Sequence, residues 1–168
     1  MKFLLTILTI MTTTSLMAQD GKASTTKKTF SRETSIRTVI NADAAIIWAL
    51  LTNAADYPRW NSTIVSLEGN IQEGEKIRLK STLDEKRTFK LKVKALVAQK
   101  KLVWGDGKGH RVFLLEAQPD GKVVFSMSEK IGGLMFPMYA KYIPPFDASF
   151  EQFARDLKQE AERVEAEK

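Results

Sequence analysis

A helical pattern of apolar positions occupies the end of the chain, from Asp147 to about Val164. Six apolar residues recur there at steps of three and four, which places them on one helix face: Phe150, Phe153, Ala154, Leu157, Ala161 and Val164. Asp147 can accept hydrogen bonds from the first backbone N–H groups, and Pro144-Pro145 prevents an earlier start. The pattern predicts one long amphipathic helix whose aromatic face needs a partner.

Apolar and polar residues alternate through most of the chain before that helix, which is typical of strands. The alternating stretches are 35–42, 63–68, 75–82, 88–97, 102–104, 111–117 and 122–130, separated by glycine-rich or Pro-Asp-Gly turns. Asp43 precedes a shorter helical pattern, and Tyr57-Pro58 forces a turn after it. A curved antiparallel sheet wrapped around the C-terminal helix covers every apolar face, so we predict an α+β fold with one or two short helices after the first strand.

The first residues have the pattern of an export signal. Lys2 gives a positive start, an apolar run follows from Phe3 to Leu16, and Ala18 supplies a small residue before Gln19. The run is shorter than the about 20 residues that span a bilayer. A buried N-terminal strand or helix is the alternative, but a polar stretch follows at once. We predict a signal peptide over 1–18, cut within a few residues of that point, a flexible polar leader over 19–34, and one domain over 35–166.

Composition bears on the size of the fold and on the cellular location of the protein. The 168 residues suffice for one domain with one core. Removing residues 1–18 takes away only Lys2 from 26 basic and 20 acidic residues, so the mature chain has 25 basic and 20 acidic residues and a net charge of +5. Because there is no cysteine, the fold has no disulfide support and no site for lipid attachment at cysteine. We expect the protein in the periplasm or outside the cell.

Several kinds of chemistry are excluded by the residues present. One histidine and no cysteine leave no ordinary metal site of nitrogen and sulfur ligands, and no spacing suggests a carboxylate cation loop. The glycine-rich run from Gly105 to Gly109 joins two strands rather than opening a helix, which indicates a hairpin turn and not a phosphate loop. Nothing evident positions His110 beside a nucleophile. We therefore predict no metal and no cofactor.

Basic residues follow one face of two predicted strands. They are Lys76, Arg78, Lys80, Lys90, Lys92 and Lys94, all opposite the apolar side. A solvated face that discourages edge aggregation is the simpler interpretation. Weak contact with an anionic membrane surface or an acidic partner is the alternative. Nucleic acid is a poorer candidate because no aromatic residue interleaves on that face.

The stretch INADAAIIWALLTNAADYPRWNSTIVSLEG, with GEKIRL, RTFKLKV, LVWGDG and FEQFARDLK, resembles the START-like helix-grip superfamily, often labelled SRPBCC. Within it, the polyketide cyclase/dehydrase-like branch of small ligand-binding proteins is the most similar. The resemblance covers about residues 35–165 and implies the helix-grip fold. It does not specify an activity, because that superfamily contains lipid carriers, hormone receptors, cyclases and proteins with no known ligand.

In a helix-grip arrangement the sheet and the terminal helix do not close completely, so we expect a cavity between them. Its predicted lining is Trp60, Phe89, Leu91, Trp104, Phe113, Phe125, Met127, Phe150 and Phe153. Alternation also directs Arg111 inward with Phe113, and Glu129 inward with Met127. An unpaired buried charge is costly. These two charges therefore either pair with each other at the polar head of a hydrophobic ligand or lie solvated at the cavity mouth.

The segment 132–146 (GGLMFPMYAKYIPPF) begins with two glycines and is rich in apolar residues, aromatics and proline. It is either a packed crossover or a cover over the cavity. As a cover, Met135 and Met138 would adapt to varied ligands, and Tyr139 or Tyr142 would offer a hydroxyl group.

Three functions follow from these residues. The first is non-catalytic binding or transport of a small hydrophobic or amphipathic molecule, lipid-like or aromatic. The second is a cyclase, dehydrase or isomerase in which Glu129 is the acid or base and Arg111 stabilises an oxyanion. The third is an envelope interaction protein that uses the basic sheet face. The sequence leaves the ligand and the oligomeric state open.

Overall fold

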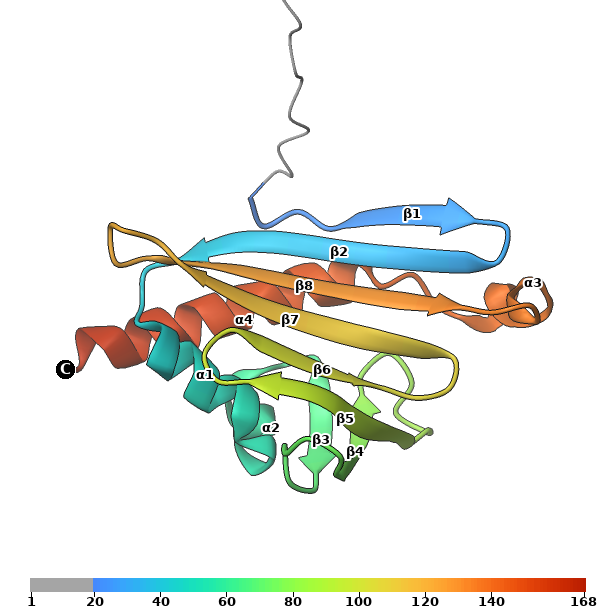
Figure 1. Ribbon diagram of the computed structural model, residues 1–168, viewed down its shortest axis with the longest axis horizontal. Coiled ribbons are helices and arrows are strands. Elements are labelled where there is room, and N and C mark those ends of the chain that lie inside the picture. The colour runs from blue at the N-terminus through green and yellow to red at the C-terminus, as the bar shows by residue number, and fades with distance from the viewer. Residues whose placement is uncertain (1–19) are drawn as a thin grey trace, which may run out of the picture.

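An eight-stranded antiparallel sheet packs against one long helix in the computed structural model, which describes residues 20–168 (Figure 1). The strands are β1 (Ser24–Lys28), β2 (Ser31–Ile40), β3 (Ile64–Glu68), β4 (Lys76–Ser81), β5 (Phe89–Val97), β6 (Lys101–Gly105), β7 (Gly109–Ala117) and β8 (Val123–Gly132), in the sheet order β1-β2-β8-β7-β6-β5-β4-β3. The helices are α1 (Ala44–Thr52), α2 (Tyr57–Trp60), α3 (Phe136–Tyr139) and α4 (Asp147–Ala166), with the 3-10 turns η1 (Ala54–Asp56) and η2 (Ala140–Tyr142). This arrangement confirms the predicted fold class and the predicted order of strand, short helices, antiparallel strands and long helix, to which the structure adds β1 and α3.

The predicted signal peptide lies outside the described residues and stays a prediction. Among residues 20–168, no helix combines the length and apolar character needed to cross a bilayer.

Helix α4 lies along the inner face of the sheet, and its apolar side is buried as the spacing predicts. The Phe153 ring contacts the rings of Trp60, Phe113 and Phe125 at centroid distances of 5.7, 5.8 and 6.4 Å. These side chains form an aromatic core at the centre of the molecule. Because tilted and edge-on aromatic pairs pack favourably, the core fixes the helix against the sheet.

The prediction for Asp147 is wrong in one respect. Phe146 occupies the capping position, and the Asp147 carboxylate instead accepts hydrogen bonds from the Thr25 hydroxyl at 3.0 and 3.1 Å. The helix therefore begins where predicted, but its first carboxylate is used to hold β1.

The prediction of a flexible leader over 19–34 is also wrong for most of its length. Ser24–Lys28 and the first four residues of β2 are paired strands, and β2 pairs with β8 as far as Gly132. The threonines of this stretch could have indicated the strands, because β-branched residues favour strands even where the buried face is polar. Thr25 and Thr34 lie opposite each other with their hydroxyl oxygens 2.7 Å apart.

The two short helices between β2 and β3 close one end of the sheet. Asp43 caps α1 as predicted, by accepting a hydrogen bond from the Ala45 N–H at 2.9 Å. The buried Tyr57 hydroxyl donates to the Leu51 carbonyl at 2.8 Å, and burial raises the pKa of Tyr57 above its usual value. This end of the molecule is thus tightly packed, whereas the opposite end carries α3 and the cavity.

Candidate ligand-binding cavity

Cross-strand register organises the inner face of the sheet into rows of side chains. One row crosses six strands and consists of Thr25, Thr34, Glu129, Arg111, Trp104 and Val93. The next rows toward α1 are mostly apolar, with Met127 beside Phe113 and Phe125 beside Leu115. Because directly opposed residues share a face, polar side chains are concentrated at the end of the sheet where α4 begins.

A cavity of about 250 Å³ occupies that polar end. It is lined by Leu79, Ser81, Leu83, Asp84 and Arg87 around β4, by Phe89 and Leu91 of β5, by Trp104, Asp106, Lys108, Gly109, His110 and Arg111 around the β6–β7 turn, by Glu129 and Ile131 of β8, and by Tyr139, Tyr142, Ile143, Pro144 and Phe146 before α4. Apolar side chains of β4, β5 and β6 form one wall, and Arg111 and Glu129 form another. The site is therefore amphipathic.

Arg111 and Glu129 meet at the wall of this cavity. The Arg111 Nε donates a hydrogen bond to Glu129 Oε2 at 2.6 Å, and the two side chains are 12% and 19% exposed. The guanidinium also lies 5.0 Å from the centroid of the Phe150 ring. Of the two possibilities that the sequence left open, the pairing of these charges is the one observed.

Arg32 ties down the segment that covers the cavity. Its guanidinium donates hydrogen bonds to the carbonyls of Ile143 and Pro144 at 3.1 and 2.7 Å, and it lies 4.7 Å from the centroid of the Phe146 ring. Desolvation lowers the pKa of Arg32, and the carboxylates of Asp147 and Glu129 oppose that shift. Arg32 was missed because it lies in the stretch predicted to be a leader.

Six of the predicted site residues line the cavity: Phe89, Leu91, Trp104, Arg111, Glu129 and Tyr142. Six others fill the core instead, namely Trp60, Phe113, Phe125, Met127, Phe150 and Phe153, each no more than 7% exposed. Phe113, Phe125 and Met127 lie on the inward face of the sheet, as predicted, but α4 covers them there. The rings of Phe113 and Phe125 pack against each other and against Phe153 of that helix. Alternation of apolar and polar residues shows which face of the sheet a side chain lies on. It does not show which part of that face a helix covers.

Met135 and Met138 do not reach the cavity. Both point into solvent and are 59% and 66% exposed. The segment as a whole still covers the site, through Tyr139, Tyr142, Ile143, Pro144 and Phe146. The expectation of a cover thus agrees with the structure, whereas the expectation that the methionines adapt to a ligand does not.

Several cavity residues were missed although the pattern contained them. Leu79 alternates with Ile77 on β4, and Ile131 continues the series that directs Met127 and Glu129 inward. Ile143 and Phe146 carry no periodic signal, because they belong to an irregular segment. Within residues 20–168, no three histidine, cysteine or acidic side chains group in a way that could hold a metal ion.

Comparison with known proteins identifies a matching family model and several solved structures with a similar fold. The family model described as Activator of Hsp90 ATPase homolog 1-like protein matches residues 41–162. A START superfamily protein from Mycobacterium smegmatis aligns at a TM-score of 0.58 and 15% identity, over 79% of this chain and 98% of that one. A conserved protein of unknown function from Enterococcus faecalis aligns at 0.60 and 16%, over 82% and 75%.

The di-domain ARO/CYC StfQ from the steffimycin biosynthetic pathway aligns at a TM-score of 0.58 and 13% identity, over 79% of this chain and 45% of that one. At such identities these likenesses establish the fold alone. No curated protein matches the chain.

Proposed function

We propose that this chain, which belongs to the Activator of Hsp90 ATPase homolog 1-like protein family within the START-like superfamily, binds a small amphipathic molecule in its cavity. The observation that carries the proposal is the cavity itself, with an apolar wall facing the paired Arg111 and Glu129. Small-molecule sites are typically concave and apolar with a few convergent polar groups.

The size and charge of the cavity limit the ligand. Its volume of about 250 Å³ lies just below the roughly 300–1,000 Å³ of pockets for drug-sized molecules, so the ligand, or its buried part, is small. Asp84, Asp106 and Glu129 balance Arg87, Lys108 and Arg111 around the lining. A balanced lining favours an uncharged polar or zwitterionic head over an ionic one.

Native mass spectrometry of the protein purified from its native host tests the proposal. We expect a non-covalent adduct that is a lipid-like or aromatic molecule. A Leu91→Trp variant, which places a larger side chain in the cavity, should be recovered without it. Repeated recovery of an empty, folded wild-type protein that also takes up no hydrophobic fluorescent probe would contradict the proposal.

A second candidate is catalysis of the cyclase, dehydrase or isomerase type in the same cavity. The contact between Arg111 and Glu129 favours it, because a carboxylate base next to a cationic donor suits proton transfer with oxyanion stabilisation. The fold is shared with the ARO/CYC protein above, which supplies an analogy only. Turnover of a bound compound that is lost in Glu129→Gln, while binding persists, is the result that would support it.

A third candidate rests on the basic outer face of β4 and β5. Lys76 lies opposite Lys92, and Arg78 lies opposite Lys90, so like charges face each other across the strands. Directly opposed like charges are destabilising. Glu68 on β3 offsets this at Arg78 through an ion pair. Reversing Lys90, Lys92 and Lys94 should abolish salt-sensitive binding to an acidic surface if this face has that role.

We also propose that the chain is exported. The support is the pattern of Lys2, the apolar run to Leu16 and the small residue Ala18. Cell fractionation with N-terminal sequencing should find a mature protein that begins close to Gln19 outside the cytoplasm. An uncleaved chain in the cytoplasm would exclude export.

A further inference from the structure

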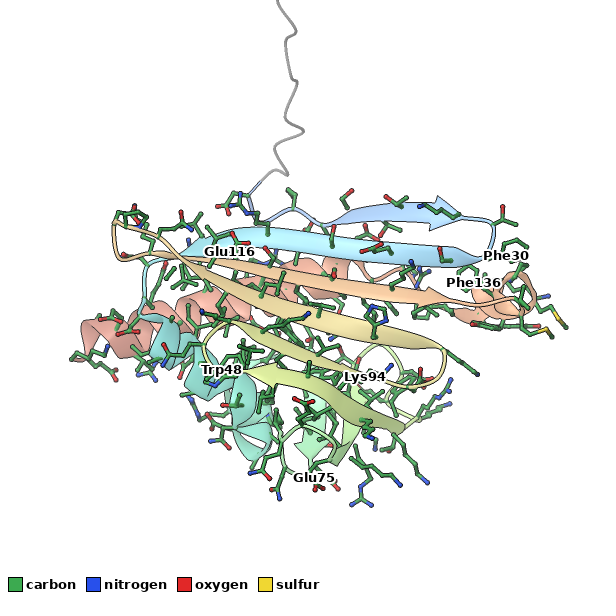
Figure 2. All side chains as sticks on the ribbon, in the orientation of Figure 1. Phe30, Trp48, Glu75, Lys94, Glu116 and Phe136 are labelled. Atoms are coloured by element: carbon green, nitrogen blue, oxygen red, sulfur yellow. The ribbon has the colours of Figure 1, made fainter. Side chains whose placement is uncertain are left out.

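Five exposed apolar side chains gather at the end of the molecule that carries α3. We call them the apolar tip: Phe30, Leu134, Met135, Met138 and Tyr142. Phe30 comes from the β1–β2 turn, which the Gly133 N–H joins to the end of β8 by a hydrogen bond to the Phe30 carbonyl at 3.0 Å. Figure 2 shows Phe30 and Phe136 at the same end, next to α3 in Figure 1.

The tip is not a loosely packed part of the core. Phe136 is buried and its ring packs edge-on against Tyr139 at 5.6 Å, while the Tyr139 hydroxyl donates to the Gly132 carbonyl at 3.2 Å. The segment is thus anchored from within. Among residues 20–168, seven large apolar side chains are exposed, and five of them belong to this tip. Such a concentration marks an interaction site, whereas scattered exposed apolar residues need no explanation.

Basic residues outnumber acidic ones around the tip, where the exposed Glu33 lies opposite Lys130. The segments 27–32 and 130–144 contain five basic residues and no acidic one. Lys27, Lys28, Lys130 and Lys141 are exposed, and the fifth residue, Arg32, holds the cavity cover. The Lys141 ammonium lies 5.0 Å from the centroid of the Tyr142 ring, so charge and apolar surface are adjacent.

An open depression of about 430 Å³ lies beside the tip on the outer face of the sheet. Phe30 borders it, and its lining includes Lys94, Lys108 and Lys130. Asp106 is the acidic residue in this lining, and its carboxylate accepts hydrogen bonds from the N–H groups of Lys108 and Gly109 at 2.7 and 2.9 Å. Basic side chains therefore outnumber acidic ones in the lining of the depression.

We infer that the apolar tip docks on an anionic phospholipid bilayer, with the tip side chains among the acyl chains and the surrounding lysines at the lipid phosphates. Apolar side chains bordered by lysines are the pattern of surfaces that lie at a membrane interface. Leu134 is 85% exposed and therefore projects from the surface. A fluid bilayer can surround a projecting side chain, whereas a folded protein partner needs a matching pocket.

The docked orientation would bring the ligand cavity to the membrane. Tyr142 belongs to the tip and also lines the cavity, and Tyr139 lines the cavity from the same segment. The inference does not depend on the cavity being occupied, because it rests on surface residues alone. Failure of the ligand proposal would leave it standing.

Vesicle flotation of the chain from residue 19 to 168 tests the inference. We expect co-flotation with phosphatidylcholine vesicles that contain one-third phosphatidylglycerol, and much less with phosphatidylcholine alone. Leu134→Glu with Met138→Glu should weaken binding to the anionic vesicles at least about tenfold, because two charges would enter the apolar region. Val65→Glu with Val97→Glu is the matched control, since these exposed apolar residues lie outside the tip.

A second pair of variants tests the charge. Lys28→Glu with Lys141→Glu should weaken anionic binding by about tenfold or more. Lys100→Glu with Lys101→Glu changes the net charge equally at the other end of the sheet and should have a smaller effect. Size-exclusion chromatography and circular dichroism of each variant show whether oligomeric state and fold are preserved.

Three outcomes would overturn the inference. The first is no flotation of the wild type with anionic vesicles at low salt. The second is equal loss from the tip variants and from their controls. The third is a self-associating wild type whose tip variants become monomeric without any change in flotation, since the tip would then be an interface between copies of this chain.

Discussion

Arg111 on β7 lies directly opposite Glu129 on β8, and its Nε donates a hydrogen bond to the carboxylate at 2.6 Å. Both side chains are largely removed from water, so each charge is stabilised mainly by the other. The pair also marks a border. On one side lies the cavity, and on the other lies the aromatic core under α4, where Phe150 contacts the guanidinium.

Breaking this pair should destabilise the fold. In Arg111→Met the largely buried Glu129 side chain loses its partner, and we expect the free energy of unfolding to fall by about 2–4 kcal/mol. Urea denaturation near neutral pH measures the change. A fully buried pair would give a loss at the upper end of this range. Because water reaches part of the Glu129 side chain, we expect a smaller loss of stability.

Two controls separate the burial of charge from the loss of packing. The double variant Arg111→Met with Glu129→Leu should recover most of the loss, because no unpaired charge remains. Arg78→Met breaks an exposed pair with Glu68 and should cost about 1 kcal/mol or less. Equal losses in Arg111→Met and in Arg78→Met would contradict the role given to burial.

The strands, the long helix and their order could be predicted because apolar residues recur at every second position in the strands and about every 3.6 positions in the helix. The β1–β2 pairing could not, because Thr25 and Thr34 face a polar part of the interior and leave no apolar alternation to read. There the hydrogen-bond network to Asp147 replaces apolar burial.

The candidate site was predictable only in part for a similar reason. Alternation placed Arg111 and Glu129 on the inner face, but their contact depends on the β7–β8 register, which the sequence alone does not specify. Phe113 and Phe125 share that inner face and still lie in the core, because α4 covers their rows. The position of an inward-facing residue along its strand therefore decides whether its side chain lines the cavity or packs in the core.

Filling the cavity should block uptake of a hydrophobic probe. Leu91→Trp adds a bulky ring to a space of about 250 Å³, and we expect binding of an uncharged, hydrophobic fluorescent probe to weaken at least about tenfold. Val97→Trp, on the same strand but exposed, should leave binding unchanged. Titration by fluorescence measures both, and unchanged binding in Leu91→Trp would place the probe elsewhere.

Truncating the aromatic core should cost far more stability than truncating the cavity wall. Phe153 contacts four aromatic rings, and Phe153→Ala should lower the free energy of unfolding by about 3–5 kcal/mol. Phe89→Ala, at the half-buried cavity wall, should cost about 1–2 kcal/mol. Chemical denaturation of both variants tests the border between core and cavity, and a larger loss for Phe89→Ala would refute it.

Stability should fall in acid through Glu160, which joins α2 to α4. Arg163 and Arg59 donate hydrogen bonds to its carboxylate at 2.9 and 2.6 Å, and these bonds, that of Arg163 above all, lower its pKa from 4.5 to about 2. A carboxyl group whose pKa is lower in the folded state stabilises fully above its unfolded pKa, and that stabilisation disappears as the pH falls through the folded pKa.

We therefore expect Glu160→Gln to be less stable than the wild type by about 1–2 kcal/mol near neutral pH, since solvent screens part of the interaction. The difference should shrink as the pH falls from about 4.5 and vanish near pH 2. Glu85→Gln, at an exposed carboxylate in the β4–β5 loop, should show little difference from the wild type near neutral pH. Urea denaturation across this pH range measures all three proteins. A stability gap for Glu160→Gln that stays constant into acid would show that packing, and not ionisation, accounts for the loss.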